Sequence, residues 1–138
     1  MAFRRYKGRT KIMWMPVTAS TAIAAGTLVT FSSGKLVAAT SSTAAIDLAG
    51  VLVKTIAATD ADYATDARLV EVLVPLDRNT VWEADVTSGL VAGDVGAEVD
   101  LTDGATVNRG ASSVKAVRVI RVLSSTKGHF LVKHFGSY

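Results

Sequence analysis

A nine-residue pattern occurs twice in this chain and constrains its fold more than any other feature. The first copy lies within residues 26–37, and the second, residues 99–107, begins seventy residues after Val29. Both copies read V-x-[F/L]-[S/T]-x-G-x-x-V, with a small polar residue before the Gly. Glycine adopts positive φ without steric cost, so each copy predicts two strands joined by a tight turn. We expect two such hairpins in one β domain.

Alternating apolar and polar residues predict further strands. Residues 68–76 place three valines on one face and Glu71 on the other, and residues 81–86 place Trp82 inward and two acidic side chains outward. Helix builders are sparse, and Gln is absent. Strands at such spacing are typical of sandwiches and small barrels. We predict an all-β fold, a compact antiparallel β-barrel or β-sandwich of about 8–10 short strands with an extended N-terminal arm.

The length of the chain sets the expected domain organisation. A chain of 138 residues can form one domain with its own core. We expect residues 1–16 to form an extended basic and aromatic arm, and residues 17–138 to form a single β-rich domain. Cysteine is absent, which excludes disulfides and thiolate metal sites. No apolar run reaches the roughly 20 residues that span a bilayer, so we expect no membrane partner.

The arm carries the most distinctive side chains. Five of the fifteen Lys and Arg residues lie in residues 1–11, which contain no acid, so the rest of the chain holds ten basic and twelve acidic residues. Such a segment has no helical period and cannot bury itself, so we expect it to become ordered only against a partner. Its aromatics would fill pockets of that partner while its cations meet acidic surface. The candidate partner-binding residues are Phe3, Arg4, Arg5, Tyr6, Lys7, Arg9, Lys11 and Trp14.

A second interpretation of the arm is nucleic-acid binding. The cations would then contact phosphates, and the aromatics would stack on bases. In this alternative the chain is a small nucleic-acid-binding β-barrel that uses the arm and a cationic C-terminal hairpin containing Arg118, Arg121 and Lys133. A solvated tail without a partner is the third interpretation.

The residues able to carry chemistry form no recognisable site in the sequence. His129 and His134 are five residues apart on one predicted strand, so they point to opposite faces; we expect surface histidines rather than metal ligands. The acidic loop of residues 60–67 lacks the glycine that an EF-hand requires at its sixth position. Neither a nucleophile elbow nor a phosphate-binding glycine loop is present. We predict that the protein is not an enzyme, with no catalytic residue, cofactor or metal site.

Strands that begin at Ala-Gly pairs resemble a known class of virus protein. The quoted segments are Ala25-Gly26 with the following V-x-F strand and glycine turn, Lys35-Leu36-Val37-Ala38-Ala39, Ala49-Gly50-Val51-Leu52-Val53, residues 90–94 and residues 101–106. Over residues 17–110 this pattern resembles the head decoration, or capsid cement, proteins of tailed bacteriophages. The basic aromatic arm is similar to the extended termini that such proteins lay across capsid subunits.

The resemblance implies a structural virion protein that binds the assembled capsid shell, bridges neighbouring major capsid subunits and stabilises the head. Its partners would be the major capsid protein and further copies of itself, with a homotrimer favoured, and not nucleic acid. It would be made in the host cytoplasm and reside on the capsid surface of the virion. A tail or connector component, which uses similar β folds, is the alternative within the structural class.

Overall fold

The computed structural model of the chain describes residues 3–77, 79–87 and 89–132. These residues form eleven strands and two short 3-10 helices. The strands are β1 (Arg4–Lys7), β2 (Thr10–Val17), β3 (Leu28–Ser32), β4 (Lys35–Ala38), β5 (Leu48–Leu52), β6 (Arg68–Pro75), β7 (Val81–Val86), β8 (Glu98–Asp103), β9 (Thr106–Asn108), β10 (Val117–Ser124) and β11 (Lys127–Val132). The helices are η1 (Ala45–Asp47) and η2 (Ala92–Asp94). The all-β prediction is confirmed, with one strand more than the upper end of the expected range.

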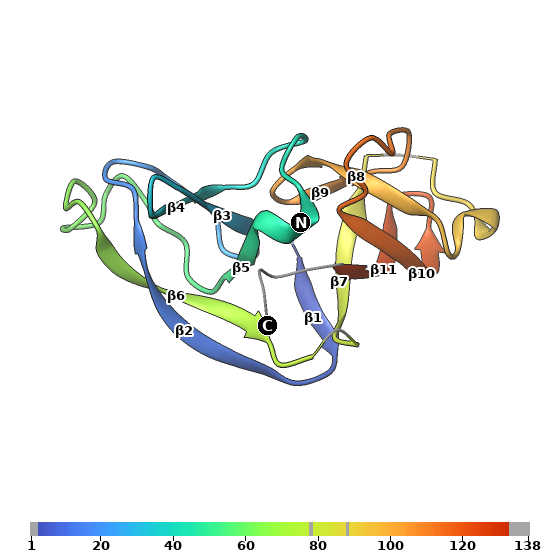
Figure 1. Ribbon diagram of the computed structural model, residues 1–138, viewed down its shortest axis with the longest axis horizontal. Coiled ribbons are helices and arrows are strands. Elements are labelled where there is room, and N and C mark those ends of the chain that lie inside the picture. Colours follow the sequence, from blue (N-terminus) through green and yellow to red (C-terminus); the bar gives the residue numbers. More distant parts are fainter. Residues whose placement is uncertain (1–2, 78, 88, 133–138) are drawn as a thin grey trace.

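The strands form two small barrels that lie side by side (Figure 1). The first barrel, at the left of the view, closes in the order β2-β4-β3-β5-β6. The second follows the order β7-β9-β8-β10-β11, and the pairing of β11 with β7 closes its ring. Strand β1 belongs to neither ring and pairs with β7.

The two barrels have the same topology. In each, the first and third strands run parallel, β2 with β4 and β7 with β9, and the other neighbours are antiparallel. Along the β2–β6 and β7–β11 ladders, the cross-strand pair Met15–Val70 of the first barrel corresponds to Ala84–Gly128 of the second. The hairpin registers differ by a bulge, since Phe31 pairs with Leu36 whereas Leu101 pairs with Val107. The sequence repeat is therefore the most similar part of a tandem pair of equivalent five-stranded barrels.

The repeated pattern forms the hairpins β3–β4 and β8–β9, which occupy equivalent places in the two barrels. A glycine two positions before each hairpin is equivalent too, since Gly26 and Gly96 have φ angles of 84° and 90°. Gly93, which also follows an alanine, lies in η2 instead. The structural counterpart is Gly96.

A buried polar residue in each hairpin fixes the loop that precedes the next strand. In the first barrel, Thr30 donates from Oγ1 to the carbonyl oxygen of Asp47 at 2.6 Å, next to the start of β5. At the equivalent position of the second barrel, the Asp100 carboxylate accepts backbone N–H bonds from residues 113, 114 and 115 at 3.0, 2.8 and 2.7 Å. Both side chains are at least nine-tenths buried.

Two clusters of buried apolar side chains make the core. One fills the first barrel, and the other fills the second barrel and continues to the junction, where it includes Phe3 and Leu28. At this junction the N–H of Leu28 donates to the carbonyl oxygen of Gly104 at 2.7 Å. A Cβ atom at position 104 would lie 2.8 Å from the Leu28 oxygen, so only glycine permits this approach. The barrels are thus packed directly on each other.

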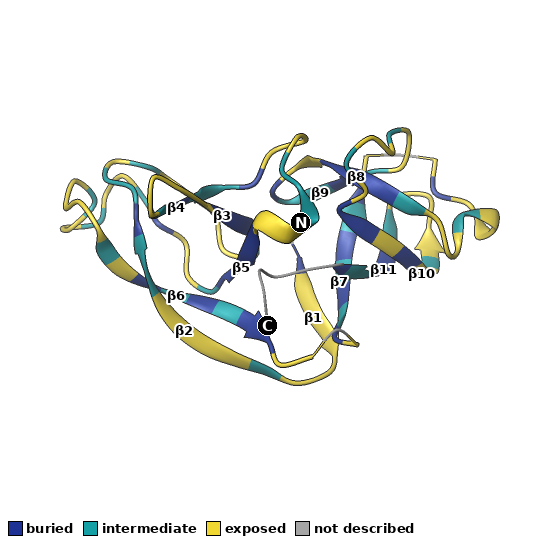
Figure 2. Ribbon diagram, in the orientation of Figure 1, coloured by how far each residue is buried: buried dark blue, intermediate teal, exposed yellow. Residues whose placement is uncertain are grey.

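The N-terminal segment is part of the sheets. Strand β2 pairs with β6 over all eight of its residues and closes the first barrel, and β1 extends the sheet at β7. The expectation that this segment becomes ordered only against a partner is therefore wrong, because strands of the same chain hold it. The expected boundary between residues 16 and 17 falls inside β2. Both strands still lie mostly at the surface (Figure 2).

The strand alternation expected from the sequence is confirmed. In β6 the three valines are buried while Leu69 is exposed, and in β7 Trp82 is buried while Glu83 is only partly so. Among the described residues, no helix has the length and apolar character needed to cross a membrane.

Candidate functional site

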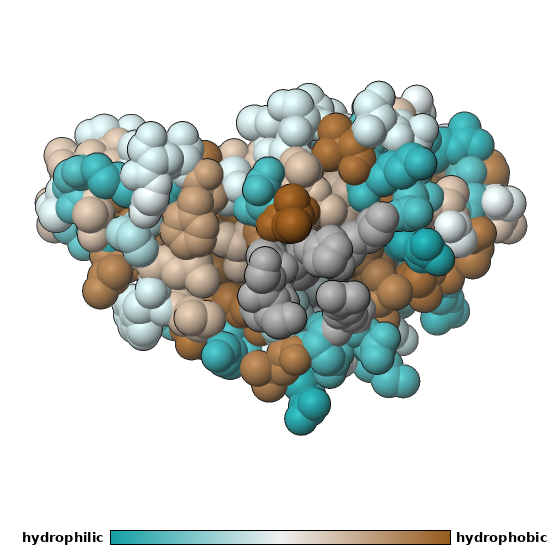
Figure 3. Space-filling view, in the orientation of Figure 1, coloured by the Kyte–Doolittle hydropathy of each residue, from teal (hydrophilic) through white to brown (hydrophobic). Residues whose placement is uncertain are grey.

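The candidate site is the β1–β2 face, defined as the surface of residues 4–16. A turn at Gly8, with φ of 112°, joins its two strands, and a Cβ there would lie 2.7 Å from Cα of Thr80, so the position requires glycine. All of β1 and residues 11–14 of β2 are exposed. In Figure 3, hydrophilic and hydrophobic side chains are mixed along the lower margin of the molecule, where this turn lies. The face therefore offers polar and apolar contacts together.

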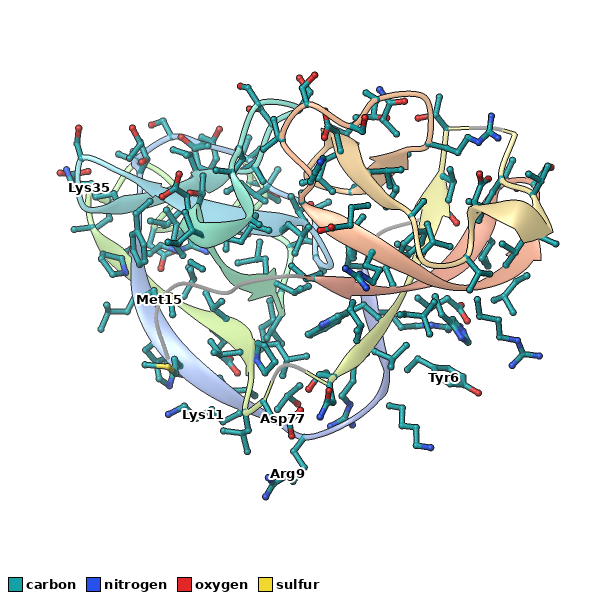
Figure 4. The ribbon with its side chains drawn as sticks, turned by 45° about the vertical axis from the view of Figure 1, so that its right-hand side comes forward. Tyr6, Arg9, Lys11, Met15, Lys35 and Asp77 are labelled. Carbon is teal, nitrogen blue, oxygen red and sulfur yellow. The ribbon has the colours of Figure 1, made fainter. Side chains whose placement is uncertain are left out.

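All three arginines on this face are engaged by other residues of the chain. Arg4 forms an ion pair with Glu83 of β7. Arg9 lies 3.8 Å from the carboxylate of Asp77, and Figure 4 shows both side chains at the outer edge of the ribbon. Arg5 donates to the hydroxyl group of the first residue of β2 at 3.1 Å. These bonds orient β1 and the turn, while the arginine side chains remain partly exposed.

Two lysines and two aromatic residues are the most available groups of the face. Within the described part of the chain, no carboxylate lies within ion-pair distance of Lys7 or Lys11, and Lys11 points away from both barrels in Figure 4. Tyr6 and Trp14 are 54% and 61% exposed as whole residues. Exposed aromatics and unpaired cations on a fixed backbone suit recognition of a protein surface, because little ordering entropy remains to be lost.

Beneath β1 lies a polar network that sequence reasoning missed. His129 is 4% exposed, and its Nε2 lies 3.2 Å from a carboxylate oxygen of Glu83. The Tyr6 ring covers the imidazole, with ring centroids 3.9 Å apart and an interplanar angle of 32°. The expectation of a surface histidine is wrong for His129, because β1 and its tyrosine cover that face of β11. His134 lies outside the described residues.

The Glu83 carboxyl is the charged centre of this network. Burial alone would raise its pKa, but hydrogen bonds from His129 and Arg4, together with the charges of Arg4 and Lys127, lower the pKa below the ordinary 4.5. The carboxylate therefore remains ionised at neutral pH and holds β1 against β7. The pairing of acidic β7 with basic β1 is a signal that the sequence already contained.

Phe3 has a structural role. Its side chain is 2% exposed within the cluster at the barrel junction, and its N–H donates to the carbonyl oxygen of Gly26 at 2.8 Å. In this structure it is not available to a partner. The remaining candidates, from Arg4 to Trp14, lie together on the β1–β2 face.

An apolar hollow of ≈ 280 Å³ adjoins the face. It lies between β1, β2 and the two barrels, and its lining is Phe3, Arg4, Arg5, Ile12, Gly26, Val51, Leu52, Val53, Leu73 and Trp82. Ile12, 50% exposed, lines the hollow, and the β2–β6 register places Trp14 and Leu69, which is 59% exposed, on the same side of this strand pair. The face thus combines cationic margins with an apolar strip.

The acidic loop is occupied by ion pairs. Arg68 contacts Asp60 at 3.1 Å and Asp62 at 2.6 Å. The pKa of Asp60 is lowered by the backbone N–H of Ala57 and by the hydrogen bond from Arg68. Among the described residues, no group of three or more His, Cys, Asp or Glu side chains is arranged to hold a metal ion.

The cationic C-terminal hairpin is partly neutralised. Arg118 lies 3.5 Å from Glu98 of the neighbouring strand, and Lys127 lies 3.9 Å from Asp85. Lys133, which the nucleic-acid interpretation also invoked, lies outside the described residues.

No protein-family model matches the chain, and no match was found among curated proteins. The functional argument therefore depends on the site itself.

Proposed function

We propose that the protein is a structural component of a virion, which binds the assembled capsid shell through its β1–β2 face and bridges neighbouring major capsid subunits. The observation that carries the proposal is this face, where exposed Tyr6 and Trp14 accompany the unpaired cations of Lys7 and Lys11 on strands held by the chain's own sheets. The resemblance of residues 17–110 to phage head decoration proteins supplies the class of partner.

The geometry favours a protein partner over nucleic acid. A nucleic-acid surface needs many cations free to contact phosphates. Here Arg4, Arg9 and Arg118 each have a carboxylate within ion-pair distance, which lowers the positive potential of both proposed basic elements. The apolar strip from Ile12 to Leu69 would find no counterpart on a phosphate backbone. Protein interfaces commonly surround such an apolar centre with charged groups.

Binding to a shell would stabilise it by linkage. A protein that binds only assembled subunits shifts the equilibrium toward assembly by an amount set by its concentration relative to its Kd. A two-barrel chain is suited to contact two subunits, because its long axis places equivalent barrels side by side (Figure 1).

Co-sedimentation with purified capsid shells tests the proposal. Trp14→Ser removes the most exposed aromatic ring and Lys11→Glu reverses an unpaired charge, and each should weaken shell binding by about tenfold or more. Arg121→Glu, an equal charge reversal on an exposed residue of β10, is the matched control and should bind as the wild type does. Folding of each variant is checked by thermal unfolding.

Three results would contradict the proposal. The first is a wild-type chain that stays in the supernatant with saturating shells. The second is full shell affinity in both Trp14→Ser and Lys11→Glu. The third is binding to free DNA that is stronger than binding to shells and falls steeply with salt, which would favour the nucleic-acid alternative.

A further inference from the structure

Comparison of the two equivalent barrels shows that β7 is paired along one edge by two strands, β9 and β1, whereas β2 is paired along the equivalent edge by β4 alone among the described strands. In the second barrel, β9 pairs only with the C-terminal end of β7, at Asp85 and Val86. The N-terminal half of that same edge, at Val81 and Glu83, is covered by β1. In the first barrel, β4 likewise pairs only with the C-terminal end of β2, at Val17. No described strand covers the rest of that β2 edge.

The free edge presents backbone groups at alternate residues. The N–H of Leu76 donates to the Arg9 oxygen at 2.9 Å, which fixes the hydrogen-bonded phase of the β2–β6 ladder. In a regular antiparallel ladder this phase directs the backbone groups of Lys11 toward β6, and those of Ile12 and Trp14 toward the free edge. Figure 1 shows this edge of β2 along the lower left margin of the molecule.

The prolines of β2 and β6 occupy positions that fit this alternation of hydrogen-bonded and outward-facing backbone groups. Pro16 stands two residues after Trp14, and Pro75 pairs with Thr10, so each occupies a position whose missing N–H costs no β2–β6 hydrogen bond. By register, Ile12 and Trp14 correspond to Val81 and Glu83, the residues that β1 covers on β7.

We propose that the free edge of β2, from Thr10 to Met15, binds an extended acidic segment of the partner protein as an added antiparallel strand. The proposal deepens the function proposed above, on which it depends for the identity of the partner. The added strand would exchange backbone hydrogen bonds with Ile12 and Trp14, as β1 does with β7.

Charge complementarity indicates which kind of strand the free edge of β2 would bind. Residues 3–16 contain five cations and no carboxylate, and Lys11 has no ionic partner among the described residues. A second copy of β2 would bring the same charges to the edge, and lysine on an edge strand disfavours such pairing between identical chains. Acidic side chains alternating with apolar ones would instead meet the lysine and cover Ile12 and Trp14.

Nuclear magnetic resonance of the full chain with a synthetic peptide, acetyl-Glu-Val-Glu-Val-Glu-amide, tests this at millimolar peptide. We expect the amide signals of Ile12 and Trp14 to shift and their hydrogen exchange to slow, while those of Lys11 and Met13, already bonded to β6, stay protected throughout. The same peptide with Lys in place of Glu should bind at least about tenfold more weakly.

A proline substitution separates backbone pairing from side-chain contact. Ile12→Pro removes one outward N–H without removing a β2–β6 bond, and should reduce peptide affinity about tenfold while the barrel stays folded. Ile12→Thr keeps the N–H and a β-branched side chain and should retain most of the affinity. If Ile12→Pro fails to fold, Trp14→Phe is the second variant, because it keeps every backbone N–H of the edge. The signal shifts and hydrogen exchange of the amides of residues 12 and 14 with the peptide then decide the question.

Several outcomes would overturn the inference. These are signal shifts located away from residues 10–15, unchanged exchange at Ile12 and Trp14, and equal affinity for the acidic and basic peptides. Dimerisation that Ile12→Pro abolishes would assign the edge to a second copy instead. Because the peptide readout involves no capsid, its failure would leave the shell-binding proposal standing, and a failure to bind shells would leave the peptide result standing.

Discussion

Replacing Asp100 by alanine tests the interior of the second barrel. The carboxylate is 4% exposed and accepts three backbone hydrogen bonds from residues 113–115, at 2.7 to 3.0 Å. Each buried amide left without a partner costs about 1–3 kcal/mol. Residues 113 and 115 are exposed, so water replaces part of the loss, and we expect a total of about 3 kcal/mol.

That loss is a large part of the stability of a small protein, which is typically about 5–15 kcal/mol. For a chain of this size it corresponds to a fall in Tm of about 9 °C, measurable by calorimetry and by urea unfolding. Asp103→Ala is the matched control on the same strand, since that exposed carboxylate accepts one bond, from Ala105 at 2.8 Å. A Tm for Asp100→Ala equal to that of the control would refute the assigned role of Asp100.

Three further predictions concern the junction of the barrels and the hold on β1. Gly104→Ala should lower the free energy of unfolding by at least about 2 kcal/mol, because its Cβ would meet the Leu28 oxygen at 2.8 Å; a neutral result in urea unfolding would count against the packed junction. Phe3→Ala should cost about 3 kcal/mol by the same measurement, since it removes a buried ring, and an unchanged midpoint would show that the N-terminus is dispensable. Glu83 has a pKa below 4.5 when folded, so its stabilising contribution is complete above pH 4.5 and is lost as the pH falls through the lower, folded-state pKa. The stability difference between wild type and Glu83→Gln should therefore shrink below pH 4.5 in thermal unfolding, and a difference that grows there would reverse the sign of the linkage.

Strands with one buried face were predictable from the sequence. In β6 the valines alternate with Leu69 and Glu71, and the structure buries the valines. Strand β2 has no such alternation, because most of its residues are exposed on both faces, and it is ordered by pairing with β6. Periodicity detects burial, so a strand fixed mainly by its neighbour leaves little trace in the sequence.

Only part of the second barrel could be predicted from the sequence, for a related reason. The repeat showed the two hairpins, where Val29 and Val99 occupy equivalent buried positions. The other equivalent strands share topology but not residue type, as where Met15 corresponds to Ala84. Equivalent packing accepts apolar side chains of different size when neighbouring positions compensate, so the duplication extends further in structure than in sequence.

The sequence indicated the candidate segment but not its physical state. The sequence identified residues 3–14 by charge and aromatic content, and the structure places residues 4–14 on the mostly exposed strands β1 and β2 and the turn between them. The sequence did not show that Phe3 is buried or that Glu83 and His129 lie beneath β1. The contacts that cover this network join distant residues, because Arg4 and Glu83 are 79 positions apart and Tyr6 and His129 are 129 − 6 = 123 positions apart. Long-range contacts of this kind follow from topology rather than local pattern.

The most direct measurement of the proposed function is an electron cryomicroscopy reconstruction of capsid shells saturated with this protein. We predict ordered density for the two barrels on the shell, with the β1–β2 face turned toward the capsid subunits and Trp14 at the contact. Shells without additional density, or a bound chain whose β1–β2 face points to solvent, would contradict the account.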